Sequence, residues 1–326
     1  MNPTIYDIAN AANVSKSTVS RVLNNHKNIS NDAKSRVLKA IEELNYQPSK
    51  IARGLAGGYD AILVISRSTK TTMNNPYFTE ILHIISSYSE VESFDVILQT
   101  SQNSEEELKK CVEKIKEKMI KGIIMLSSPS DEELFIELDN YQVPVVVIGK
   151  VKGVYKNIYS VDTNNYENSY NLVKNLIHLG HKHIACLYSP QDYQVSIDRL
   201  SGYVDCMNDF QLTVREEFVI NCGFTLEDSY SATKKLFEEN NLPTAIFATD
   251  DLKLISLYKL IVENKLSTSD IQVAGYSNSE VIPILFPSII PIKNPTSELG
   301  KRATNILFSI IKGNTVVDRS VIIPAE

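Results

Sequence analysis

Short apolar runs alternate with longer amphipathic stretches from residue 61 onward. The first four runs are AILVIS at 61, FDVILQ at 94, GIIMLS at 122 and PVVVIG at 144. A second series comprises HIACLY at 183, EFVINC at 217, TAIFAT at 244 and IQVAGY at 271. Helical stretches such as 165–179 and 252–263 separate these runs. Because apolar runs of this length are typical of buried parallel strands, the pattern predicts an α/β body of two lobes.

The first fifty residues have a helical period instead. An apolar stripe at i, i+3, i+4 and i+7 is formed by Ile5, Ile8, Ala9 and Ala12. Thr4 precedes it as an N-cap, and Asn13 follows where a tight turn needs a left-handed residue. Ser15 can then cap a second helix. Two short helices joined by a tight turn predict a helix-turn-helix.

The second helix has one apolar and one polar face. Val19, Val22 and Leu23 point one way, and the opposite face carries Lys16, Ser17, Ser20, Arg21 and Asn24 without any acid. Hydrogen-bonding side chains and cations of this kind suit phosphates and base edges in a major groove. A merely solvated helix face is the alternative.

A third helix is expected to begin at Ser30 and to end before Pro48, since proline disfavours helix in the residue before it. Its predicted buried residues are Ala33, Val37, Ile41 and Leu44. The sequence therefore predicts a compact three-helix head.

Charge divides the chain in the same way. The 326 residues carry a net charge of −6, yet residues 1–58 hold eight Lys and Arg against four acids. That balance of +4 leaves −10 for the remainder. A basic head on an acidic body is expected when one domain meets phosphate and the other does not.

Several other classes of protein find no support. The sequence has no apolar run of membrane-spanning length and no export signal, so we expect a cytoplasmic protein. The four cysteines, Cys111, Cys186, Cys206 and Cys222, have no metal-ligand spacing, and we expect reduced core thiols and no metal or cofactor. No nucleophile elbow or phosphate loop follows a strand, which argues against an enzyme.

Ligands of parallel α/β sheets bind outside the carboxyl ends of the strands. The residues just after the apolar runs are therefore candidates, and they include Lys150, Thr249, Asp250, Ser277 and Asn278.

The segments TIYDIANAANVSKSTVSRVLNN and ISNDAKSRVLKAIEELNYQPSKIARGLA resemble the head and hinge of the LacI/GalR family of transcription regulators. The resemblance implies a repressor that binds double-stranded DNA as a homodimer. It also implies a hinge helix over 49–56, in which Leu55 would enter the minor groove beside Lys50 and Arg53. With the polar face described above, Thr4, Ser15 and Thr18 complete the set expected to contact DNA.

The resemblance continues through the body, which is similar to two-lobed periplasmic sugar-binding proteins. Its landmarks are NPYF at 75, VDTNN at 161, DRLSGY at 198, ATDD at 248, AGYSNSE at 274 and NPTSELG at 294. It implies effector contacts by Tyr77, Phe78, Asp162, Arg199 and Phe224. The alternatives are that Phe78 is plain core, that Arg199 pairs with a neighbouring aspartate, and that Phe224 packs between the lobes.

Ser277 and Thr249 depart from the family pattern, which often has an acid and an asparagine there. Even so, the body looks most like the maltose-operon repressors of Gram-positive bacteria, which implies maltose or a related α-glucoside as effector. A phosphoprotein coregulator, as some relatives use, is an alternative. A sugar-binding receptor and an enzyme on the same fold are the rivals.

The expected domains are a helix-turn-helix head over 1–47 and a hinge over 48–58. The first lobe is expected to comprise 59–160 and 287–316, and the second lobe 161–286 and 317–326.

Overall fold

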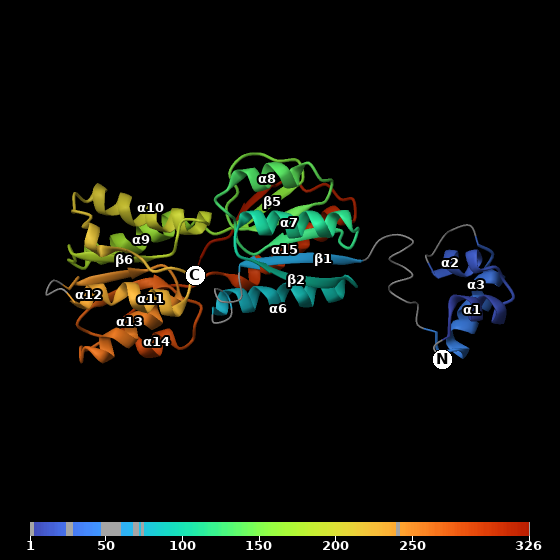
Figure 1. Cartoon of the computed structure of the whole chain (residues 1–326), viewed down its shortest axis with the longest axis horizontal. Coiled ribbons are helices and arrows are strands. Elements are labelled where there is room, and N and C mark those ends of the chain that lie inside the picture. The colour runs from blue at the N-terminus through green and yellow to red at the C-terminus, as the bar shows by residue number, and fades with distance from the viewer. Residues whose placement is uncertain are drawn as a thin grey trace. The chain divides into compact units, whose positions relative to one another are not determined.

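The structure, a computed structural model, describes residues 3–23, 29–46, 60–67, 72, 75–238 and 242–325. The chain folds into two compact units, residues 1–59 and residues 60–326. The first unit is the helical head and the second is the α/β body (Figure 1). This confirms the predicted fold class.

Three helices form the head, namely α1 (Ile5–Ala11), α2 (Lys16–Leu23) and α3 (Asn31–Glu43). Ile8, Val19 and Val37 are fully buried, one from each helix. Ser30 caps α3 by accepting a hydrogen bond from the backbone N of Ala33 at 3.3 Å. The apolar stripes predicted from the sequence therefore meet in one small core.

Two asparagines end helices of the head in the left-handed conformation. Asn13 has φ +50° after α1, as predicted, and Asn45 has φ +46° after α3. Each turn lets the next residue donate back to the helix, and the Tyr46 N–H bonds the carbonyl of Ile41 at 2.9 Å. The reversal buries Tyr46, whereas Leu44, which we expected in the core, is 38% exposed.

The first lobe of the body is built on a parallel sheet with the order β11-β5-β4-β3-β1-β2. Its strands are β1 (Ala61–Arg67), β2 (Asp95–Ser101), β3 (Gly122–Met125), β4 (Val145–Ile148), β5 (Ile158–Asp162) and β11 (Ser320–Ile322). Its helices are α6 (Pro76–Val91), α7 (Ser104–Lys116), α8 (Glu132–Asp139) and α15 (Thr296–Ile311).

Helices cover both faces of this sheet. The side chains of Ile62 and Val64 pack with α6 and α15 on one face. Leu63 and Ile65, the alternate residues of β1, pack with α7 and α8 on the other. Burial on both faces explains why the strand was an uninterrupted apolar run in the sequence.

The second lobe has a parallel sheet with the order β10-β9-β8-β6-β7. Its strands are β6 (Ile184–Tyr188), β7 (Val219–Asn221), β8 (Ala245–Ala248), β9 (Gln272–Tyr276) and β10 (Ile290–Ile292). A 3-10 turn (Glu216–Phe218) precedes β7. The helices are α9 (Asn165–His178), α10 (Gln194–Asp209), α11 (Leu226–Thr233), α12 (Lys235–Glu238), α13 (Asp251–Glu263) and α14 (Ile282–Leu285). In Figure 1, α9 and α10 lie on one side of β6 and α11 and α13 on the other.

The chain leaves the first lobe after β5 and returns to it at α15. Our predicted lobe boundaries were wrong at the C-terminal end in two places. Strand β10 lies in the second sheet, although 287–316 was assigned to the first lobe. Strand β11 lies in the first sheet, although 317–326 was assigned to the second, because Val321 pairs with Val161 of β5. These two strands have three residues each, too few to form a clear apolar run.

Candidate functional site

The outward face of α2 presents polar side chains. Lys16, Ser17 and Arg21 are exposed, whereas Val19 and Val22 are buried in the core of the head. The helix contains no Asp or Glu. A helix that exposes hydroxyls and cations without carboxylates can approach phosphates and base edges in a DNA groove.

Hydroxyls at the helix starts of the head are engaged within the protein. Ser15 Oγ accepts a hydrogen bond from the Thr18 backbone N at 3.1 Å and lies 2.7 Å from Ser17 Oγ. Thr4 donates from its backbone N and its hydroxyl to Asp7, both at 2.7 Å. The backbone hydrogen bond is the main cause that lowers the pKa of Asp7. In this structure Thr4 and Ser15 therefore fix the starts of α1 and α2.

Tyr6 was not selected from the sequence, although it is 60% exposed. Lys16 Nζ lies 4.7 Å from the centre of its ring and donates to its hydroxyl at 3.1 Å. Tyr6 therefore adds an aromatic group beside the polar face of α2, where Ser20 is half-buried. An aromatic residue outside the apolar stripe of α1 was the available signal. Four predicted DNA contacts, Asn24, Lys50, Arg53 and Leu55, and the hinge segment 48–58 lie outside the described residues.

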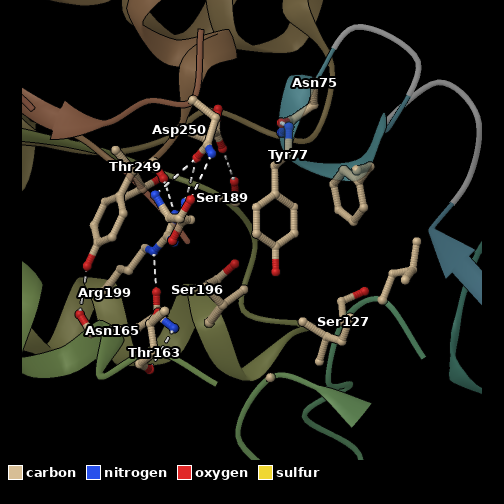
Figure 2. Close-up of a pocket in the computed structure, with 18 of the residues that line it drawn as sticks. Asn75, Tyr77, Ser127, Thr163, Asn165, Ser189, Ser196, Arg199, Thr249 and Asp250 are labelled. Carbon is tan, nitrogen blue, oxygen red and sulfur yellow. Dashed lines mark hydrogen bonds between the residues drawn. The ribbon is translucent and has the colours of Figure 1, made fainter. Parts of the chain in front are cut away.

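A pocket lies between the two lobes of the body (Figure 2). Its empty volume is about 810 Å³ with the mouth included, within the size range of small-molecule sites. Eight of the predicted effector contacts line it, namely Tyr77, Phe78, Asp162, Arg199, Thr249, Asp250, Ser277 and Asn278. The other two, Lys150 and Phe224, are not among its lining residues.

Arg199, on α10, holds together the two segments that connect the lobes. Its Nε donates to Asn165 Oδ1 at 2.9 Å, and one terminal nitrogen lies 3.4 Å from Asn294 Oδ1. The other terminal nitrogen donates to the carbonyl of Thr249. The guanidinium also stacks on Tyr276, with 3.4 Å between Cζ and the ring centre. Three donors of Arg199 are thus used by Asn165, Thr249 and Asn294 within the protein.

Asp250 has a fully buried lysine beside it that the sequence did not lead us to select. Lys253 Nζ lies 2.8 Å from Asp250 Oδ2, donates to Ser189 Oγ at 2.7 Å and to the Gly223 carbonyl at 3.1 Å. Asp250 Oδ1 caps α13 by accepting from the backbone N of Leu252 at 3.0 Å. Burial would raise the pKa of Asp250, but Lys253, Arg199 and Ser189 together outweigh it and lower the pKa. Both carboxylate oxygens are therefore occupied.

Asp162 ends β5, lines the pocket and is 7% exposed. Asn165 Nδ2 donates to its Oδ1 at 3.1 Å. Burial raises the pKa of Asp162 to about 7, against the opposing effect of a hydrogen bond that the backbone N–H of Thr163 donates to the carboxylate. A carboxyl group in this environment can accept or donate a hydrogen bond near neutral pH.

Ser277 and Asn278 follow β9 and connect to the chain segment that returns to the first lobe. The hydroxyl of Ser277 bonds a carboxylate oxygen of Asp251, and the backbone N of Asn278 donates to the other oxygen at 3.2 Å. Asn278 Nδ2 donates to the carbonyl of Asn294 at 2.9 Å, and Asn294 N returns a bond to Asn278 Oδ1 at 3.2 Å. Where the family often has an acid, Ser277 therefore places a hydroxyl that is hydrogen-bonded to Asp251.

Lys150 lies outside the pocket lining. Its Nζ is 3.7 Å from Asp198 Oδ2, and the lysine side chain is 53% exposed. Gln194 Nε2 donates to Asp198 Oδ1 at 2.6 Å. Because Lys150 belongs to the first lobe and Asp198 to the second, this pair joins the lobes.

Phe224 packs beside the pocket against an arginine that we did not select from the sequence. Arg67, the last residue of β1, has its Cζ 3.6 Å from the ring centre of Tyr193, 5.5 Å from Phe224 and 5.8 Å from Phe78. Its Nε donates to Ser127 Oγ at 3.2 Å. Arg67 lines the pocket and is 9% exposed. Phe224 therefore contacts this interlobe cluster, as one of the alternatives expected.

Within the described part of the chain, no group of His, Cys, Asp or Glu side chains could hold a metal ion. All four cysteines are free and buried, as predicted. Among the same residues, no helix combines the length and the apolar character needed to cross a membrane.

Two family models match the chain over nearly its whole length. The model described as "Bacterial regulatory proteins, lacI family" matches residues 4–49. The model described as "Periplasmic binding proteins and sugar binding domain of LacI family" matches residues 60–326. The two matches coincide with the helical head and the α/β body.

Individual proteins are similar over the same length. Catabolite control protein A of Priestia megaterium is 28% identical over 330 residues, which cover 99% of this chain and 96% of the relative. The HTH-type transcriptional repressor PurR of Haemophilus influenzae (strain PittEE) is 28% identical over 310 residues, covering 94% and 91%. The crystal structure of the lac repressor dimer bound to operator and the anti-inducer ONPF aligns with a TM-score of 0.80 at 23% identity, covering 100% and 97%. The finer resemblance to maltose-operon repressors is not specifically supported by these relatives.

Proposed function

The chain belongs to the LacI family of bacterial regulatory proteins, and on this premise we propose that it represses transcription by binding a symmetric operator as a dimer. A small sugar in the interlobe pocket would control the affinity for the operator. The family description and the PurR relative identify regulators, and the chain is accordingly a regulator rather than an enzyme.

The observation that carries the proposal is the acid-free polar face of α2, on a helical unit separate from the pocket. Arg21 and Lys16 are exposed on it while Val19 and Val22 hold the helix in the core. Arg favours guanine in the major groove, and hydroxyls can bond phosphates or base edges. We assign α2 as the recognition helix.

Two copies are needed because each recognition helix reads one half-site. A symmetric operator then mirrors the twofold axis of the protein. The lac repressor, which shares this fold, was solved as a dimer bound to operator. We propose the same stoichiometry here.

The pocket supports a sugar as effector. It is lined by the aromatic rings of Tyr77, Phe78 and Tyr276 and by hydroxyl, amide and carboxyl groups from both lobes. The matched body model is described as a sugar-binding domain. We propose maltose or a related α-glucoside, because the NPYF segment and the VDTNN segment resemble those of maltose-operon repressors.

The proposed mechanism is thermodynamic linkage between the pocket and the head. An effector that binds one relative orientation of the lobes more tightly shifts the population toward it, and operator affinity changes by that differential free energy. We propose that the sugar favours the arrangement with low operator affinity and so acts as an inducer. A phosphoprotein coregulator, which the family resemblance implies for some members, is the second candidate.

The test is fluorescence anisotropy of a labelled duplex that has been selected from a random library on the full-length protein. Titrations are run at one fixed salt concentration, since phosphate contacts dominate affinity. We expect an inverted repeat to be selected, bound tightly, and released by maltose. Tight binding indifferent to every sugar would refute sugar control and direct attention to a coregulator protein. Failure to select any duplex would refute the repressor proposal.

A further inference from the structure

Two buried hydroxyls in the pocket lack a hydrogen-bond partner among the described residues. They are Ser128 Oγ, in the loop after β3 of the first lobe, and Thr249 Oγ1, directly after β8 of the second lobe. Each residue is only 3% exposed, and both line the pocket. One unsatisfied hydroxyl therefore comes from each lobe.

The surrounding backbone holds both residues in place. The carbonyl of Ser128 accepts from the Gln194 N of the opposite lobe at 2.9 Å. A Cβ added at Gly149, which has φ +137°, would meet the Cβ of Ser128 at 3.0 Å. Thr249 N donates to the carbonyl of Leu187 at 3.0 Å, and its own carbonyl accepts from Arg199. The backbone of both residues is therefore held in place, while neither hydroxyl has a hydrogen-bond partner among the described residues.

An unsatisfied buried hydroxyl costs stability, because it has lost its hydrogen bonds to water and gained none in the protein. Such groups are rare enough in folded proteins that each one needs an explanation. A pair that lines one pocket from two lobes is explained if a ligand supplies the missing hydrogen bonds. The ligand-free protein is then less stable by the cost of these unsatisfied hydroxyls, because they are held ready to bind the ligand.

The charged groups of the pocket, by contrast, are largely committed to the protein. Both oxygens of Asp250 are occupied by Lys253 and the start of α13, and Asp251 is held by Ser277 and Asn278. Arg199 uses three donors on Asn165, Asn294 and Thr249. The lining contains the cations Arg67 and Arg199 and the acids Asp162, Asp250 and Asp251. With Lys253 beside Asp250, three cations face three acids when Asp162 is ionised, so the lining carries no large net charge that would select a charged ligand.

We propose that Ser128 and Thr249 are specificity-determining contacts, and that the effector is an uncharged polyhydroxy compound bonded to both hydroxyls at once. Such a ligand joins the two lobes through groups that are otherwise unsatisfied. The inference rests on the proposed sugar control, and it identifies the residues and the ligand charge on which that control depends.

The test uses Ser128→Ala and Thr249→Val in the full-length protein. Isothermal titration calorimetry measures the binding of maltose, cellobiose and glucose 6-phosphate to each protein. Each substitution removes one neutral hydrogen bond to the sugar, so we expect the Kd of the bound neutral sugar to rise roughly three- to tenfold. Without ligand, neither variant should melt below the wild type, because each loses an unsatisfied hydroxyl.

Two control variants separate this effect from general perturbation. Ser66→Ala removes another buried hydroxyl without a partner among the described residues, which does not line the pocket. Thr249→Ser keeps the hydroxyl while removing a methyl group. Both should bind the sugar within about twofold of the wild type, well inside the effect of one lost hydrogen bond.

The outcomes are distinguishable. If the wild type binds a neutral sugar and Ser128→Ala and Thr249→Val bind it equally well, the hydroxyls are met by water alone and this inference is overturned while sugar control stands. Tighter binding of glucose 6-phosphate than of either neutral sugar would overturn the uncharged ligand. If no sugar binds the wild type although it still binds its duplex, the proposed sugar control fails and the inference falls with it.

Discussion

The guanidinium carbon of Arg67 lies 3.6 Å from the centre of the Tyr193 ring. Arg67 ends β1 in the first lobe, whereas Tyr193 precedes α10 in the second, so this contact joins the lobes beside the pocket. The backbone reinforces it, because Ser130 N donates to the carbonyl of Asp192 at 2.9 Å. The lobes are thus held by side-chain stacking and by a short stretch of backbone pairing.

A double-mutant cycle on Arg67 and Tyr193 should show strong coupling. Arg67→Met and Tyr193→Leu each remove one partner, and a desolvated cation–π contact is worth about 1–2 kcal/mol. We expect that coupling in the free energy of urea unfolding of the body. Tyr193→Phe keeps the ring and should retain most of it. Strictly additive single-variant effects would contradict the assigned contact.

Replacing Lys253 should strongly destabilise the second lobe. Lys253→Met leaves the half-buried carboxylate of Asp250 without its fully buried cation, and the cost should approach the value of about 3–5 kcal/mol that is typical of a broken buried pair. Denaturant unfolding measures it, and adding Asp250→Asn should recover much of the loss. Lys259→Met is the matched control on the same helix, since Lys259 is 61% exposed and 3.8 Å from Glu263, and it should cost less than about 1 kcal/mol. Equal losses for the two lysines would be incompatible with the buried pair.

Asp162 should make the ligand-free body less stable as pH rises. Its pKa is about 7 in the folded chain and about 4 when unfolded. Between these two pKa values the folded chain keeps a proton on Asp162 that the unfolded chain has lost. The contribution of this proton to the free energy of unfolding is complete below about pH 4 and is lost as pH rises through about 7. The slope contributed is at most about 1.4 kcal/mol per pH unit.

The charged neighbours of Asp162 are Asp198, Arg199 and Lys150, of which the first raises its pKa and the others lower it. Thermal unfolding from pH 4 to pH 8 should show a shallower decline in Asp162→Asn than in the wild type. Glu137→Gln, on the exposed side of α8, should leave the profile unchanged. A wild-type profile identical to that of Asp162→Asn would rule out the buried titration.

Arg21→Ala should weaken binding to the selected operator by about 1–3 kcal/mol and binding to random DNA much less. The reason is that base contacts give specificity, whereas phosphate contacts act on every duplex. Anisotropy titrations on both duplexes measure the difference. The control is Lys39→Ala, since Lys39 is an exposed residue of α3 whose Nζ lies 3.7 Å from Glu43. This substitution should not change the ratio of the affinities for the selected operator and for random DNA. An equal loss of Arg21→Ala on both duplexes would remove Arg21 from base recognition.

Much of the architecture could be predicted because it follows from local patterns. Apolar runs such as AILVIS and PVVVIG became strands buried on both faces, and Asn13 adopted the left-handed turn that its side chain tolerates. Residues after strands, such as Thr249 and Asp250, converged on one pocket, since parallel strands end at the same edge of a sheet. The same rule would have selected Arg67, which directly follows the run AILVIS.

Partnerships across the fold were harder to predict. Asp250 and Lys253 are three residues apart on a helix, but only the fold shows that Ser189 and Gly223 enclose the lysine. Lys150 follows a strand, yet its side chain turns toward Asp198 and not into the pocket. Such choices depend on segments distant in sequence. The lobe assignment of β10 and β11 failed for the same reason.

The first lobe is built from two separate parts of the chain, and this limits the order in which the two lobes can fold during synthesis. Leu299 and Leu307 of α15 share a core with Ile62 and Val64 of β1, so the lobe that is begun first cannot close until that late helix has emerged. The second lobe runs without interruption from α9 to β10 and is available earlier. During synthesis the second lobe can therefore fold before the first, and one face of β1 stays uncovered until α15 has been synthesised.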